Sequence, residues 1–318
     1  MTFFKIAANT FLESIREPIY FIMLFSVFVI VGFMPGFTLF VFFQQLKMVI
    51  DSSMATTLIF GMIVLVLSAS NTLAREMRNG TVLLLMSKPI HRWVFVIAKV
   101  SGIIASGILF TFLTHLATLI AIYTASDQFR FNMYSFCGFF AVLIIAIAFG
   151  LFMNFQRNSS FSEMTIKSLV VLLPIWTVVC HVFICDKPEV DVSNVITAMV
   201  LVTYAVCIMG TLAVVFAVKY DIVANLFFCT ILFFAGLLSN FLFNRETDIA
   251  IWAFIQKIFY VALPNWQYFW LADSVALDRI IPRSYLIYSG IYTVLYIFIV
   301  SLWAITFFQT REIAKDSR

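Results

Sequence analysis

The side chains best suited to chemistry are two histidines inside apolar segments, His115 and His181. An imidazole at membrane depth can relay protons, but a single helical histidine is more often a packed, hydrogen-bonding residue. His181 and Cys185 are four positions apart and share a helix face, with Cys180 adjacent, and this spacing suits a soft metal. Two ligands do not complete a metal site. We therefore expect packing at these positions and predict no metal site.

Nucleophilic and nucleotide chemistry is not indicated either. An intramembrane protease or transferase needs a nucleophile with a nearby base, and the serines and threonines of the apolar segments have no such companions. The phosphate-binding pattern GxxxxGK[ST] does not occur in the sequence. We therefore expect no catalytic residue and no cofactor on this chain. Any energy from ATP would have to come from another subunit.

Positive charge is concentrated in the stretch 75–99, between two long apolar runs. It contains one acid, Glu76, and five of the twenty lysines and arginines: Arg75, Arg78, Lys88, Arg92 and Lys99. A basic loop between membrane spans is held on the cytoplasmic side of the membrane. This stretch therefore predicts the orientation of the whole chain.

The composition predicts an all-α, polytopic membrane protein embedded in a lipid bilayer. Hydrophobic residues make up 63% of the chain, charged residues 11%, and the mean hydropathy is +1.04. That is more apolar surface than a soluble core of 318 residues can bury. The net charge of +4 is spread over loops, so we expect no nucleic-acid partner. The five cysteines form no CxxC pair and are expected to be packing residues.

Apolar runs of spanning length predict about eight transmembrane helices. Their ranges are 19–43, 54–74, 94–124, 133–153, 166–184, 195–218, 222–243 and 285–308. The segment 44–53 is expected to be a short loop, and Pro35 and Gly36 are expected to kink or end the first span. Residues 2–17 alternate apolar and polar side chains at helical spacing, which predicts an N-terminal interfacial helix.

This arrangement places thirteen of the twenty basic residues on the cytoplasmic side and seven outside. The bias predicts a multi-pass protein of the cytoplasmic (inner) membrane with both termini in the cytoplasm. Apart from Lys99 near the start of the third span and Lys167 at an edge, the predicted spans contain no charged residue. Ion-coupled carriers normally need such residues, so this class is disfavoured.

The charged stretch also contains an ordered motif. Its elements are Arg75-Glu76, Gly80-Thr81, a leucine run, Ser87-Lys88-Pro89-Ile90, and Arg92. Gly80 suits the end of one helix and Pro89 the first turn of the next, which leaves 81–86 as a short separate helix. Charged side chains around this helix suit pairing with a partner, while the leucines supply apolar contact. The alternative is a basic loop that only obeys the charge bias, with leucines on the lipid surface.

This motif, together with the amphipathic N-terminal helix and proline-bounded first span, resembles the permeases of type-2 ABC exporters over nearly the whole chain. The resemblance implies that 75–93 is a cytoplasmic coupling helix that docks in a groove of a separate ATPase. Its docking residues would be Glu76, Arg78, Gly80, Thr81, Leu84, Lys88, Pro89 and Arg92. It also implies an extracytoplasmic gate-like segment at 244–283. That segment would include Trp252, Phe259, Pro264, Trp266 and Trp270, of which the cluster 264–270 is also of the kind that sits at a membrane interface.

We therefore predict a single permease domain, 1–318, with a six-span core and an extra hairpin at 166–218. The resemblance implies two copies of an ABC ATPase that bind ATP, and a second permease half, identical or different. The complex would export a substrate, and an apolar path favours an amphipathic or lipid-like one. A non-transporting membrane scaffold or assembly factor is the alternative class, because it also needs no intramembrane charge.

Overall fold

Helices form every regular element in the described part of the chain. The computed structural model describes residues 2–41, 44–78, 91–125, 131–184, 190–243, 250–276 and 279–316. Within these ranges there are twelve α-helices, two short 3-10 helices and one π-helical turn, and there is no strand. The prediction of an all-α protein is confirmed.

Seven of the described helices are long and apolar enough to cross a membrane. They are α2 (Pro18–Phe37), α3 (Gln45–Arg78), α5 (Arg92–Thr124), α6 (Met133–Arg157), α7 (Phe161–Val179, continued by the π-helical η2, Cys180–Ile184), α8 (Val192–Lys219) and α13 (Arg283–Asp316). A bilayer core requires about 20 residues of helix. Each of the seven reaches that length, α7 together with η2. The chain is a multi-pass membrane protein.

The predicted span 222–243 is divided in the structure. It forms α9 (Ile222–Leu237) and α10 (Ser239–Phe243), with a break at Leu238. At the break the hydroxyl of Ser239 donates to the carbonyl oxygen of Gly236 at 2.8 Å. With 16 residues, α9 is shorter than each of the seven spanning helices. The predicted hairpin 166–218 is occupied by α7 and α8, which are both of spanning length.

The prediction of a loop at 44–53 was wrong, because α3 already begins at Gln45. Val49, Ile50 and Met54 are fully buried in this first part of the helix. Their spacing continues the buried face of the span, so packing maintains the helix through a polar stretch. At the preceding turn α2 ends at Phe37, two residues after Pro35, as expected.

The most buried spanning helix is α8, which contacts α3, α5 and α13. In its most apolar window 78% of the residues are buried, compared with 28% in α6 and α13 and 22% in α7. At its centre Leu65 of α3 is fully buried where Gly107 of α5 and Gly210 of α8 have no side chain. Small residues let helix backbones approach closely in membranes, so three spans meet there.

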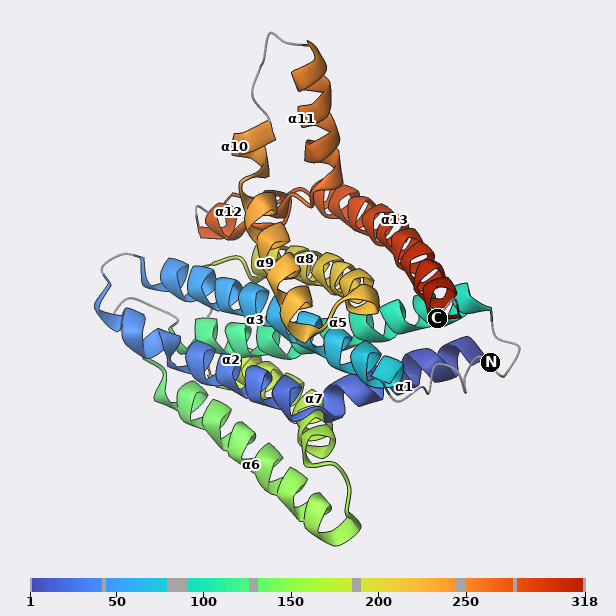
Figure 1. Cartoon of the computed structure of the whole chain (residues 1–318). Helices are drawn as coiled ribbons and strands as arrows, with labels where there is room; N and C mark the ends of the chain where they lie inside the picture. Colours follow the sequence, from blue (N-terminus) through green and yellow to red (C-terminus); the bar gives the residue numbers. More distant parts are fainter. Residues whose placement is uncertain are drawn as a thin grey trace.

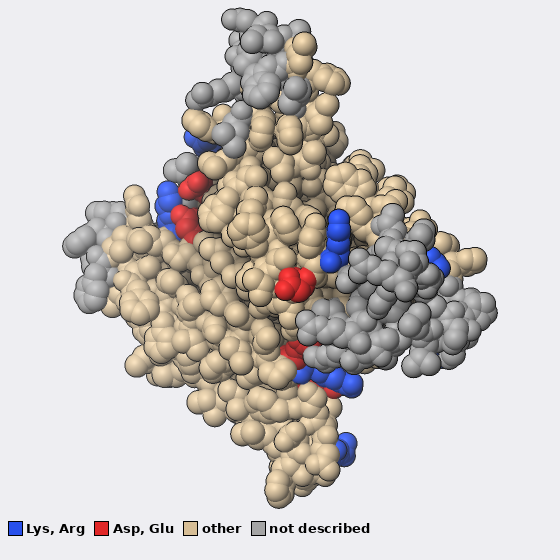
Figure 2. All heavy atoms as spheres, in the orientation of Figure 1, with Lys and Arg blue, Asp and Glu red and all other residues tan. Residues whose placement is uncertain are grey.

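Both termini lie at one end of the molecule, on the right in Figure 1. The end of α3 and the beginning of α5 are found there too, and α1 (Thr2–Arg16) packs against α5. In the same view α9, α10 and α11 (Ala250–Ala262) rise away from the α2, α3 and α5 layer. On the face that Figure 2 shows, charged side chains are sparse and most of the described surface is uncharged. Such a surface suits an apolar surrounding.

Candidate coupling end and gate-like segment

The structure describes the two helices that flank the predicted coupling segment. The segment's central residues lie outside the described residues, and these are Gly80, Thr81, Leu84, Lys88 and Pro89. Glu76 and Arg78 belong to the last turns of α3, and Arg92 is the first residue of α5 and is exposed. The two flanks therefore reach the same end of the molecule as the termini.

The beginning of α5 is tied to the end of α13. His91 precedes the helix in an extended conformation, and its ring stacks on Trp93 with centroids 6.4 Å apart. One turn on, Phe95 packs against Phe308 of α13 at 5.6 Å. Lys99 is 1% exposed, and its ammonium lies 5.8 Å from the centre of the Phe95 ring. A displacement of this part of α5 would therefore act on α13.

Helix α1 is in close contact with α5 at Gly102. A Cβ added at this glycine would lie 2.6 Å from the Cβ of Thr10 and 2.7 Å from the carbonyl oxygen of Ala7. Only a residue without a side chain permits this approach. Thr10 and Ser14 are fully buried, and their hydroxyls donate to carbonyl oxygens one turn earlier in α1. The buried hydroxyls of α1 therefore form their hydrogen bonds within the helix itself.

The apolar stripe predicted for α1 is divided. Ile15 is 2% exposed and belongs to the core, whereas Phe4 is 76% exposed. The exposed part suits contact with lipid, and the buried part fixes the helix to the bundle.

Two further contacts fix the junction between α1 and α2. Asn71 of α3 donates from Nδ2 to Oε2 of Glu17 at 2.6 Å, and Glu17 is 7% exposed. The hydroxyl of Tyr20, 1% exposed, donates to the carbonyl oxygen of Ser106 in α5 at 2.8 Å. A buried carboxylate is stable only when charges or hydrogen bonds compensate it. The junction is thus held to both α3 and α5.

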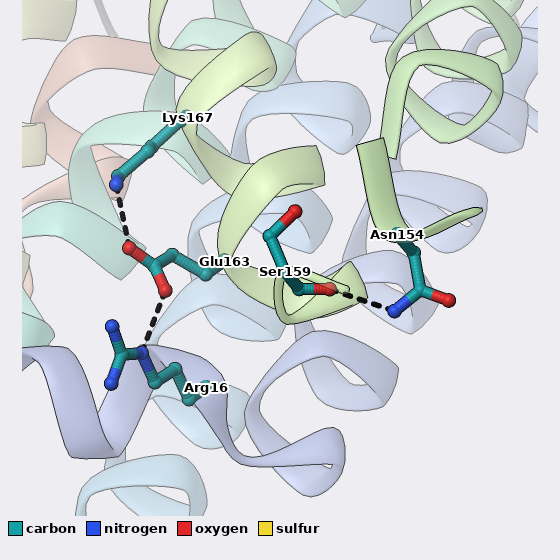
Figure 3. A network of polar contacts seen from close by, with 5 residues as sticks. All are labelled: Arg16, Asn154, Ser159, Glu163 and Lys167. Carbon is teal, nitrogen blue, oxygen red and sulfur yellow. Dashed lines mark hydrogen bonds and ion pairs between the residues drawn. The ribbon is translucent and has the colours of Figure 1, made fainter. Parts of the chain in front are cut away.

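A third connection joins α1 to α7 through Glu163 (Figure 3). Arg16 Nε donates to Oε2 of Glu163 at 2.6 Å, and Lys167 Nζ donates to Oε1 at 2.5 Å. The Glu163 side chain is 6% exposed, while each cation is 53% exposed. The carboxylate lies in the first turn of α7, where the helix dipole also favours negative charge.

The turn before Glu163 is ordered by its own hydrogen bonds. Asn158 ends α6 in the left-handed conformation, with φ 50°, which asparagine tolerates better than most residues. Asn154 Nδ2 donates to the carbonyl oxygen of Ser159 at 2.7 Å, as Figure 3 shows. The Ser159 hydroxyl donates to the carbonyl oxygen of Met153 at 2.9 Å. These bonds fix where α7 begins, and hence where Glu163 lies.

Sequence reasoning missed the roles of Glu17 and Glu163. The available signal was their position: Glu17 directly precedes a span that begins with Pro18, and Glu163 is four residues before Lys167. Their partners Asn71 and Arg16 are 54 and 147 positions away in the chain. Periodicity does not report such long-range pairs.

In the gate-like segment, Trp266 is buried inside the protein. It is 2% exposed, packs against Phe233 of α9 with ring centroids 6.3 Å apart, and its Nε1 donates to the carbonyl oxygen of Leu232 at 3.4 Å. Trp266 therefore packs against α9, and the expected place of the cluster 264–270 at a membrane interface stays a prediction. Pro264 beside it is buried, and Trp270 is partly buried.

The other predicted gate residues lie on α11. Phe259 is 50% exposed and stacks on Phe243 of α10 at 5.7 Å. Trp252 belongs to the same helix, and its side chain lies outside the described residues. The structure thus brings α10 and α11 together but places Phe259 away from Trp266, on a different element.

A hydrogen-bonded cluster joins α10, α11 and the 3-10 helix η3 (Trp266–Phe269). The Tyr260 hydroxyl donates to Oδ1 of Asn240 at 3.1 Å and lies 2.6 Å from the Tyr268 hydroxyl. Asn240 also accepts from Asn265 at 2.7 Å and donates to Gln267 Oε1 at 2.5 Å. The hydrogen bond with Tyr260, and then partial burial, raise the pKa of Tyr268 to about 12. The cluster therefore keeps its neutral phenol at any physiological pH.

Both histidines inside spans have hydrogen-bonding neighbours. His115 Nε2 lies 3.2 Å from the Thr203 hydroxyl, and His181 Nδ1 lies 2.8 Å from the Tyr123 hydroxyl. These contacts favour the packing interpretation. Cys185, the second half of the considered metal pair, lies outside the described residues. In the described ranges, histidines, cysteines and acids form no group of three or more that would hold a metal ion.

The fold and the contacts of α1 define an α-helical, polytopic membrane protein whose N-terminal helix is fastened to several spans. The chain belongs to the ABC-2 family of transporter proteins, and the family model matches residues 4–185, from α1 to the end of α7 and η2. As a member, it is the membrane-spanning permease of an ABC transporter, a kind of subunit that works with an ABC ATPase. No curated protein and no solved structure gives a significant match.

Proposed function

We propose that this permease couples ATP hydrolysis on a separate ATPase subunit to export, through the segment 75–93. The observation that carries the proposal is the family match over 4–185, which includes the whole segment and both of its flanking helices. The proposed docking residues are those named above, from Glu76 to Arg92. The resemblance to type-2 exporters supports this assignment by analogy.

The contacts around α1 suggest how movement would spread. A displacement of the segment acts first on the end of α3 and the beginning of α5. These helices are fastened to α1 and α2 by the Glu17–Asn71 bond, the Tyr20–Ser106 bond and the contact at Gly102. The Arg16–Glu163 pair extends the connection to α7. Packed interfaces switch between discrete arrangements rather than bend, so these helices would move as one body.

The proposed assembly contains two copies of the ATPase, which bind ATP, and a second permease half that is identical or different. It lies in the cytoplasmic membrane with both termini inside. This permease contributes no catalytic residue and no cofactor. The substrate would pass between the two halves, and their apolar, aromatic surfaces favour an amphipathic or lipid-like substrate. Residues 244–283 would form the gate, with Trp266 as its fixed point on α9.

The test is co-purification with the ABC ATPase and measurement of stimulated ATP hydrolysis. Arg92→Glu and Gly80→Pro should each reduce ATPase retention by about tenfold, since a lost charge-assisted contact costs about 1.5–3 kcal/mol and proline opposes helix formation. Arg157→Glu is the matched control, because Arg157 is an exposed arginine at the end of α6 outside the segment. It should retain the ATPase.

A folded permease that never retains an ATPase and never stimulates hydrolysis would contradict the proposal and favour the scaffold class. Equal retention by Arg92→Glu, Gly80→Pro and Arg157→Glu would remove the docking role from 75–93 while leaving the transporter assignment.

A further inference from the structure

A cavity of about 260 Å³ lies between α3, α8 and α9. Ile59, Met62 and Val66 of α3 form one wall, Met209 of α8 contributes to another, and Leu226 and Phe233 of α9 face them. All six side chains are apolar. Methionine is flexible and polarisable, so two of them at this site suit an occupant of variable shape.

The cavity exists because α9 is attached to the bundle on either side of it. At its first turn Asn225, fully buried, donates from Nδ2 to the Ser70 hydroxyl at 2.7 Å and to the carbonyl oxygen of Ala213 at 3.0 Å. Near its other end, Leu232 accepts the bond from Trp266. These two attachments fix the distance of α9 from α3, so the middle of the helix does not close onto it.

The lining offers no polar group to a ligand among the residues that the structure describes. Its one hydroxyl, on Thr230, donates to the carbonyl oxygen of Leu226 at 2.7 Å. The thiol of Cys229 donates to Oδ1 of Asn225 at 3.3 Å. A polar occupant would lose its hydrogen bonds with water and find no replacements, which costs several kcal/mol in an apolar site. The site therefore selects an apolar occupant.

The position of the cavity makes hydrocarbon available to it. Ile59 lies at the middle of Gln45–Leu73, the membrane-crossing part of α3. At the mouth Ile59, Leu226 and Phe234 are 46%, 37% and 57% exposed, and all three are apolar. The cavity thus opens sideways at the depth where acyl chains surround the protein.

The volume sets the size of the occupant. A cavity of about 150 Å³ in another protein holds benzene. A methylene group is about as large as a water molecule, which takes up roughly 30 Å³ in the liquid, so this cavity has room for about nine methylene groups. A chain that comes from the bilayer gains nothing by leaving water, because lipid tails are as apolar as the lining, so van der Waals contact with the cavity walls is what holds it.

We propose that this cavity binds a single alkyl chain of about eight to nine carbons. The chain has two sources, the transported substrate or a resident lipid of the bilayer. The binding site itself does not depend on the transport assignment, whereas the substrate source rests on the proposed function.

The test is photolabelling in nanodiscs, with a phospholipid that carries a diazirine in one acyl chain. Peptides containing 59–66 and 226–234 should be labelled more strongly than the exposed face of α13 around Phe298. Thr230→Trp places a bulky ring at the cavity and should reduce labelling of both peptides several-fold, because the alkyl chain loses the space that the ring takes and its contacts with the walls. Ile231→Trp is the matched control, because the adjacent Ile231 is 47% exposed and does not line the cavity.

Thr230→Val keeps the volume and removes only the hydroxyl, so it should label like the native chain. Size-exclusion profiles of all three variants show whether each is folded. Labelling of the cavity peptides at the level of α13 would overturn the proposal. An equal reduction in Thr230→Trp and Ile231→Trp would overturn it as well.

A second arm separates the two sources of the chain. With the ATPase and ATP present, a substrate chain should leave the site during turnover, and labelling should fall several-fold from its level without nucleotide. A resident lipid should give unchanged labelling. Both results support an alkyl site, and neither depends on whether 75–93 is the docking segment.

Discussion

Glu163 shows how much one side chain contributes to the arrangement of the helices. It is a nearly buried carboxylate that bonds to a cation on its own helix and to another on α1. The two cations are equally exposed, so solvent screens them equally. They differ only in what they connect, since Lys167 is four residues away and Arg16 belongs to another element.

The matched pair Arg16→Met and Lys167→Met separates these roles. Exposed ion pairs within a helix contribute about 0.3–0.5 kcal/mol, so Lys167→Met should have little effect on the free energy of unfolding in mixed micelles. Arg16→Met also removes the connection between α1 and α7, and it should cost about 1 kcal/mol and increase proteolysis within α1. Equal effects of the two substitutions would contradict a connecting role for Glu163.

At the scale of elements, the apolar runs located the spans closely because hydrophobic length is a local property. The predicted range 94–124 became α5, Arg92–Thr124, and 195–218 became α8, Val192–Lys219. The helical start at Gln45 and the break at Leu238 were not predictable in this way. The helical start depends on packing in the bundle core around Val49, and the break depends on Trp266, which packs beside α9. These packing partners are distant in sequence.

The candidate site was predicted only in part for the same reason. The charge and glycine pattern of 75–93 is local, so the sequence predicted a segment there, and the structure confirms the two helices that flank it. The fastening of α1 was not visible, because Glu17, Gly102 and Glu163 acquire their roles from residues on other helices.

The contact of α1 with α5 predicts that Gly102→Ala is destabilising. The added methyl would press on the backbone of Ala7, so α1 must shift, and overpacking of this kind costs about 1–3 kcal/mol. Gly36→Ala is the control, since no atom lies within 4 Å of the position of its added Cβ. Thermal unfolding in detergent should show a lower midpoint for Gly102→Ala alone. Equal unfolding midpoints for the two variants would contradict the close contact between α1 and α5 at Gly102.

The buried position of Trp266 beside α9 predicts that substitutions within the gate-like segment lower the free energy of unfolding by unequal amounts. Trp266→Ala would empty a buried site beside α9 and should cost about 3–5 kcal/mol, as large-to-small changes of buried aromatic residues do. Phe259→Ala removes a half-exposed ring and should cost far less. Chemical unfolding of both variants in mixed micelles provides the comparison. A larger loss for Phe259→Ala would show that α11, not η3, anchors the segment.

At the scale of the whole molecule, one end of the bundle collects the parts assigned to coupling. Both termini, the end of α3 and the beginning of α5 lie there, and α1 is fastened nearby to α3, α5 and α7. The central claim is that this end faces the cytoplasm and receives an ATPase at 75–93. If it does, residues of the segment are reachable only from inside the cell.

The most direct test is the labelling of Leu84→Cys with a membrane-impermeant maleimide, in a chain whose five native cysteines are replaced. Intact cells should give no labelling, inverted membrane vesicles should give strong labelling, and added ATPase should protect the cysteine in those vesicles. Labelling in intact cells, with none in inverted vesicles, would place the segment outside and contradict the account.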